Sequence, residues 1–127
     1  MIPLSLVYRI HQSLIDEFGG AQGVRDLDGL KSALERPLQT FDNTELYPAI
    51  LEKVAAVLES ILINHPFVDG NKRTAYAIAR IVLLQNRRDI NATEQDKYQL
   101  IVGIAAGDIK FDEILSWLKI QSFELGP

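Results

Sequence analysis

Apolar residues recur along this chain at the spacing of helix faces, and the alternation typical of strands is scarce. A first helix is predicted from an N-cap at Ser5 to Phe18, where two consecutive glycines end it. A second, shorter helix is predicted from Leu27 to about Arg36, because the proline that follows disfavours helix in the residue before it. Residues 37–47 are polar and turn-rich without an apolar stripe, so we expect a flap or short hairpin there.

Four more helices are predicted in the rest of the chain. One begins near Pro48, which a first helical turn tolerates, and runs to Asn64. The next spans about 71–86; it is apolar almost all round and is therefore placed at the centre of the bundle. The fifth opens at Thr93, with Asp96 as a capping-box partner, and the sixth covers about 111–122. The predicted fold is a compact all-α domain of about six helices that occupies residues 1–127.

Composition narrows the classes of protein that this chain can be. Its 127 residues are 47% hydrophobic and 24% charged, the balance of one globular domain. It contains no cysteine, which excludes disulfides and thiolate metal sites and fits a reducing cytoplasm. We expect neither a secretion signal nor a membrane span, since no apolar run approaches about 18 residues. A net charge of −4 argues against direct nucleic-acid binding through a broad basic face.

One segment breaks the core pattern with concentrated polar chemistry. The stretch from His65 to Arg73, HPFVDGNKR, lies directly before the most apolar helix. A helix N-terminus binds anions because its first N–H groups are unpaired and the helix dipole is positive there. Gly70 can adopt backbone angles closed to other residues, so the loop can fold its amides around a phosphate.

The side chains of this segment have distinct chemical capacities. Arg73 offers a planar fork for two phosphate oxygens and Lys72 a point charge. Asn71 can donate to an anion or lock the loop. Asp69 is an oxygen ligand suited to Mg²⁺, although it could also cap the following helix. His65 can accept a hydroxyl proton near neutral pH, although a loop histidine can also simply cap the preceding helix.

The sequence HPFVDGNKRTA resembles the signature of the Fic/Doc family, which in Fic enzymes reads HPFx(D/E)GNGR. The resemblance implies that His65 is the general base and that Asp69 holds Mg²⁺. It also implies that the phosphates of a nucleotide, ATP, are gripped by the remaining positions of the motif: Gly70, Asn71 and Arg73. Weaker similarity to Doc-type (death-on-curing) chains extends over the whole sequence, including residues 10–11, 19–20, 23–26, 34–37 and 47–48.

Lys72 departs from the adenylyl-transferring Fic pattern, which has glycine at this position, and is similar to Doc toxins, which have lysine. A long cationic side chain fills room that glycine leaves for phosphates, so the nucleotide is expected to bind differently. The Doc resemblance implies a kinase that moves the γ-phosphoryl group of ATP to a threonine of elongation factor Tu and halts translation and growth. A Fic-type adenylyltransferase is the alternative. An inactive fold that serves as a binding module or repressor partner is a second one.

Regulation by a separate protein is also expected. The inhibitory pattern of many Fic proteins, (S/T)xxxE(G/N), is approached by Ser13–Glu17 but fails at Phe18. The Doc resemblance implies a cognate antitoxin whose C-terminal segment lies in a groove of this chain. In this resemblance residues 37–47 form a peptide-binding flap, with an ordinary loop as the equal alternative.

Four further residues are assigned from sequence alone. His11 sits beside the apolar stripe of its helix and is interpreted as a structural histidine rather than a second base. Arg25 and Asp26 are interpreted as an ion pair at a helix start, with a place in the substrate groove as the alternative. Trp117 is expected in the core or on a partner-facing surface.

Overall fold

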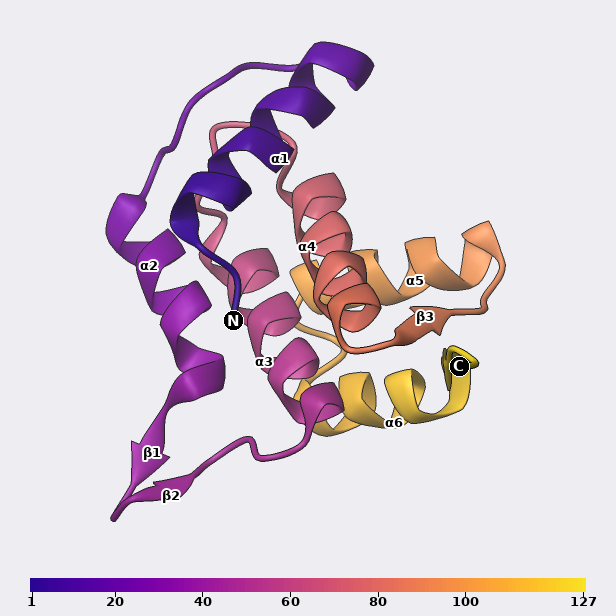
Figure 1. Ribbon diagram of the computed structural model, residues 1–127. Coiled ribbons are helices and arrows are strands. Elements are labelled where there is room, and N and C mark those ends of the chain that lie inside the picture. The colour runs from indigo at the N-terminus through magenta and orange to yellow at the C-terminus, as the bar shows by residue number, and fades with distance from the viewer.

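The computed structural model describes all residues 1–127 and contains six α-helices and two small antiparallel strand pairs (Figure 1). The all-α prediction is confirmed. The helices are α1 (Leu4–Phe18), α2 (Leu27–Glu35), α3 (Ile50–Asn64), α4 (Asn71–Gln85), α5 (Glu94–Ala105) and α6 (Phe111–Gln121). None of them is long and apolar enough to cross a membrane.

Helices α3 and α4 pack along each other and form the centre of the molecule. Helix α3 also contacts α2, α5 and α6, while α1 lies across α4 (Figure 1). The core side chains of α3 lose all or nearly all of their exposure: Val54, Ala55, Ala56, Val57, Leu58, Ile61 and Leu62. Burial of these apolar side chains removes apolar surface from water, and this stabilises the packing of α3 against α4. The two helices flank residues 65–70, which are called the motif loop.

The helix ends differ in detail from those predicted. Helix α1 has Pro3 rather than Ser5 at its N-cap, without a side-chain hydrogen bond, so the Ser5 cap was wrong. Helix α2 ends at Glu35 and continues as a short 3₁₀ turn, Arg36–Leu38, because proline is compatible with a first turn. Thr93 caps α5 as predicted, accepting the Asp96 N–H at 3.0 Å. The Asp96 side chain returns no hydrogen bond to the Thr93 backbone, so the predicted capping box is only half formed.

Residues 37–47 contain a hairpin of β1 (Thr40–Phe41) and β2 (Thr44–Glu45), which projects from the body of the molecule beside α2 (Figure 1). Lys53 of α3 holds its base, donating to Glu45 Oε1 at 2.8 Å and to the Tyr47 carbonyl at 2.6 Å. The expectation of a short hairpin is therefore confirmed.

A second strand pair joins the end of α4 to the C-terminal end of the chain. The strands β3 (Arg88–Ile90) and β4 (Ser122–Glu124) pair antiparallel, and neither was predicted. Arg80 of α4 donates to Asp89 on β3 at 3.0 and 3.2 Å. This hydrogen bond from Arg80 lowers the pKa of Asp89.

Candidate functional site

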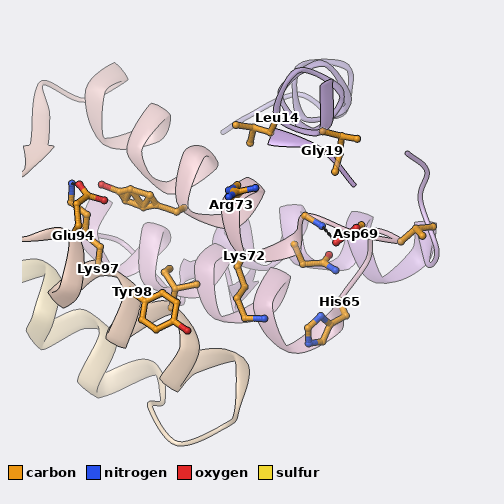
Figure 2. Close-up of a pocket in the computed structure, with 15 residues that line it drawn as sticks. Leu14, Gly19, His65, Asp69, Lys72, Arg73, Glu94, Lys97 and Tyr98 are labelled. Carbon is orange, nitrogen blue, oxygen red and sulfur yellow. Dashed lines mark hydrogen bonds and ion pairs between the residues drawn. The ribbon is translucent and has the colours of Figure 1, made fainter. Parts of the chain in front are cut away.

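A cleft of about 690 Å³ opens between the end of α1, the motif loop, the start of α4 and one face of α5. Figure 2 shows side chains from these segments arranged around it. Its lining includes all of the predicted site residues: His65, Asp69, Gly70, Asn71, Lys72 and Arg73. The motif loop therefore does not lie on a flat surface, and a ligand at the start of α4 is also within reach of α1 and α5.

His65 is the C-cap of α3 and has left-handed backbone angles, φ 47° and ψ 57°. Its side chain is half-buried and forms no hydrogen bond within the chain. Figure 2 shows the imidazole and the Lys72 side chain directed toward the same side of the cleft. No group of the chain occupies the imidazole nitrogens, so they are open to a ligand in the cleft.

The start of α4 presents a row of backbone donors that have no acceptor within the chain. Gly70 is its N-cap with φ 75°, and no side chain caps the helix. Thr74 is the first residue of α4 whose N–H group donates to a backbone carbonyl. Its acceptor is the Gly70 carbonyl oxygen, at 3.0 Å. The N–H groups of residues 71–73 have no acceptor in the chain and can receive an anion.

Asn71 holds the shape of the motif loop. Its Oδ1 accepts the Phe67 N–H at 2.9 Å and its Nδ2 donates to the Phe67 carbonyl at 3.0 Å. These bonds use both polar atoms of the side chain. Of its two predicted roles, Asn71 therefore has the one of locking the loop. The contribution of Asn71 to an anion site comes from its backbone N–H group.

Asp69 is exposed and its carboxylate lies between two backbone donors. The Gly70 N–H donates to Oδ1 at 2.9 Å and the Ala21 N–H to Oδ2 at 3.3 Å. Gly20 lies so close that a Cβ there would be 2.8 Å from Asp69 Oδ2. Asp69 therefore does not cap α4, and the loop after α1 fits closely around its carboxylate.

Asp69 is the exposed carboxylate of the motif that lines the cleft. No group of three or more His, Asp or Glu side chains gathers in the chain. Mg²⁺ at nucleotide sites is commonly held by one or two carboxylates together with phosphates and water. An exposed carboxylate at the rim of an anion site fits that requirement, so Asp69 is the residue that would hold the ion.

The two cations of the motif behave differently. The Lys72 ammonium has no hydrogen-bonding partner in the chain, and its side chain is exposed. The Arg73 guanidinium stacks on the ring of Phe18 at the end of α1, 4.3 Å from its centroid. Neither cation is neutralised by a carboxylate, which leaves positive charge at the positive end of the α4 dipole.

Beneath the loop, His11 is 3% exposed and stacks on Phe67 with ring centroids 4.0 Å apart. Its Nε2 lies 2.8 Å from the Asp69 carbonyl oxygen, to which it donates. The interpretation of His11 as a structural histidine is confirmed. Trp117 packs against the core, one of the two positions expected for it.

Arg25 and Asp26 do not form an ion pair, so that interpretation was wrong. Asp26 is the N-cap of α2 and accepts the Gly29 N–H at 2.9 Å. Arg25 instead turns to the C-terminal end of α3 and donates to the carbonyls of Asn64 and His65. A long side chain that satisfies backbone carbonyls some 40 residues away has no signature in the sequence.

The wall of the cleft formed by α5 was also not predicted. It contributes Glu94, Lys97, Tyr98 and Ile101 (Figure 2). Lys97 donates to Glu94 Oε1 at 3.2 Å, and this bond raises the pKa of Lys97 although burial acts in the opposite direction. Tyr98 is 68% exposed and presents an aromatic ring at the rim. The apolar stripe of α5 located the helix, but only the tertiary packing brings its outer face to the motif.

Comparisons with known proteins agree with the geometry. The model of the Fic/DOC family matches residues 2–83, which include the motif loop and all of α4 except its last two residues. A curated protein named Toxin Doc, from Mycolicibacterium smegmatis, is 39% identical over 103 residues. The matched region covers 80% of this chain and 79% of that relative.

Proposed function

Because the chain belongs to the Fic/Doc family, we propose that it is the toxin of a toxin–antitoxin pair and acts as a protein kinase. In this proposal it transfers the γ-phosphoryl group of ATP to a hydroxyl group of a protein. The observation that carries the proposal is the shared cleft, in which His65, the free N–H groups of residues 71–73 and the unpaired Lys72 ammonium face one ligand space. The name of the relative, Toxin Doc, supports the toxin part.

The chemical step needs a base and an anion site side by side. The imidazole of His65 accepts the proton of the acceptor hydroxyl, whose oxygen forms a bond to the γ-phosphorus while the bond from that phosphorus to the ADP oxygen breaks. The N–H groups at the start of α4 hold phosphate oxygens, and Lys72 and Arg73 add positive charge. The products are a phosphorylated side chain and ADP.

Mg²⁺, held by Asp69, would neutralise phosphate charge when bound. The close fit of Gly20 and Ala21 around the carboxylate keeps Asp69 at the rim of the anion site. His11 fixes the backbone of the same residue from below. The chain therefore orients the carboxylate from two sides.

Lys72 favours phosphoryl over adenylyl transfer. Its side chain extends into the ligand space beside His65, where glycine would leave room (Figure 2). A point charge at this place attracts the terminal, most negative phosphate of ATP toward the base. The reacting phosphorus is then the γ rather than the α atom.

The acceptor protein and the regulator are proposed from the Doc resemblance. Elongation factor Tu is the proposed acceptor, which implies that the chain acts in the cytoplasm and stops translation. A cognate antitoxin, with its C-terminal segment in a groove of this chain, is the proposed regulator. Harmless overexpression of the chain alone would contradict the toxin assignment.

Labelled ATP tests the chemistry. The purified chain is incubated with purified elongation factor Tu, or with bacterial extract whose own labelling is subtracted, and with ATP labelled at the α- or the γ-phosphate. We expect label on protein from the γ position only, and none with His65→Ala. Label retained only from the α position would establish the adenylyltransferase instead, and growth arrest by His65→Ala equal to that by the parent would favour a binding module.

A further inference from the structure

Arg25, which lies in the connection between α1 and α2, makes an unusual set of contacts for an exposed side chain. Its Nη2 donates to the Asn64 carbonyl at 2.8 Å and to the His65 carbonyl at 2.6 Å, and its Nε donates to the His65 carbonyl at 2.9 Å. It forms no salt bridge with any carboxylate. The guanidinium is therefore committed to the backbone that ends α3 and carries His65.

The backbone around Arg25 reinforces these bonds. The Arg25 and Asp26 N–H groups both donate to the Pro66 carbonyl, at 2.7 and 3.0 Å. The Val68 N–H donates to the Gly23 carbonyl at 3.0 Å. Three consecutive carbonyls, those of residues 64–66, thus accept hydrogen bonds from Arg25 and its neighbour.

The His65 backbone needs such support. The last carbonyls of a helix have no partner within the helix and must find other donors. His65 is also a non-glycine residue with φ 47° and precedes Pro66, and both features make the left-handed conformation unfavourable. A residue persists in such a conformation only where its surroundings fix it.

We infer that Arg25 is the positioning residue for His65: it holds the end of α3 in the left-handed turn that directs the imidazole into the cleft. The inference rests on the proposed function, in which His65 is the base. Arg25 touches neither nucleotide nor acceptor in this role and acts only through the backbone of the base. Without it the turn relaxes toward the extended conformations that proline favours, and the imidazole shifts relative to the hydroxyl that it must deprotonate.

Three variants test this inference on the full chain. Displacing a catalytic group by about 1 Å can cost 100-fold in rate, so we expect Arg25→Met to lower kcat about 100-fold. The KM for ATP should stay within about twofold, because the phosphate donors of α4 are untouched. Arg25→Lys keeps one donor group but loses the planar guanidinium, and it should lower kcat about 10-fold. Arg9→Met is the matched control, since Arg9 is exposed and makes no hydrogen bond, and it should behave as the parent.

A structural readout separates this inference from the proposed function. The backbone NMR shifts of His65 report its left-handed conformation without any need for activity. We expect these shifts to move toward extended values in Arg25→Met and not in Arg9→Met, while circular dichroism shows the helices intact. If Arg25→Met does not fold, Arg25→Lys decides by the same two measurements.

The outcomes are distinct. Unchanged His65 shifts, or unchanged kcat, in the Arg25 variants would overturn the inference. A raised KM with unchanged kcat would overturn it too, because that result places Arg25 in ligand binding. A parent chain that transfers no label would overturn the proposed function, and the His65 shifts would still decide whether Arg25 positions that residue.

Discussion

Replacement of Asn71 by alanine is expected to destabilise the chain even though Asn71 lies in the ligand cleft. The side chain makes two hydrogen bonds to the backbone of Phe67, at 2.9 and 3.0 Å, and Phe67 is 1% exposed. Each bond contributes about 1 kcal/mol net, and a buried group left without a partner costs about 1–3 kcal/mol. We therefore expect Asn71→Ala to lower the free energy of unfolding by about 2–4 kcal/mol, a large share of the roughly 5–15 kcal/mol typical of a domain.

Urea unfolding followed by circular dichroism, without nucleotide, measures this loss. Asn91→Ala is the matched control, because the Asn91 side chain is exposed and makes no hydrogen bond, and it should change stability by less than about 0.5 kcal/mol. A loss below about 1 kcal/mol in Asn71→Ala would refute the reasoning. It would mean that the amide does not support the loop.

Three further predictions concern stability. Gly70→Ala should lower the free energy of unfolding by about 1–2 kcal/mol, since φ is 75° there and a Cβ would lie 2.9 Å from Ile15 Cδ1; an unchanged urea midpoint would contradict this. Thr74→Val should raise the free energy of unfolding by about 1 kcal/mol, because the buried Thr74 hydroxyl has no hydrogen-bonding partner. A lower melting temperature of this variant would contradict the prediction. Arg80 lowers the pKa of Asp89, so this pair should stabilise the chain above about pH 4 and lose its effect as the pH falls through the lowered pKa. In melting curves Asp89→Asn should be less stable than the parent at pH 7, and the two should converge in acid; a constant difference would refute the assignment.

The parts of the fold that were predicted from sequence are those that local patterns determine. The apolar stripes located all six helices, and the glycine pair after Phe18 marked the end of α1. The strands β3 and β4 were not predicted, because each has three residues and is defined by pairing with a segment more than 30 positions away. Short strands of this kind carry too few residues to show a period.

The candidate site also has features that the sequence predicts and features that only the folded structure shows. The motif itself is contiguous, so its side chains could be named from sequence, and the two open roles of Asn71 were resolved only by the distances to Phe67. Arg25 was misassigned because its nearest opposite charge in sequence is Asp26, whereas its acceptors are carbonyls on another helix. Every residue has a backbone carbonyl, so the sequence does not show which carbonyl accepts a hydrogen bond from a distant side chain.

The positions of the two motif cations are consistent with the proposed phosphate site. Arg73 stacks on Phe18, whose ring is 53% exposed, and a cation–π contact at such a site contributes about 0.5–1 kcal/mol. A hydrogen bond from a guanidinium to a charged phosphate contributes about 1.5–3 kcal/mol. A phosphate within reach of Arg73 therefore outcompetes the ring. The stacking contact holds the guanidinium at the edge of the cleft, so two adjacent cations lie at the positive end of α4 without a paired carboxylate that would compete with the nucleotide of the proposed reaction.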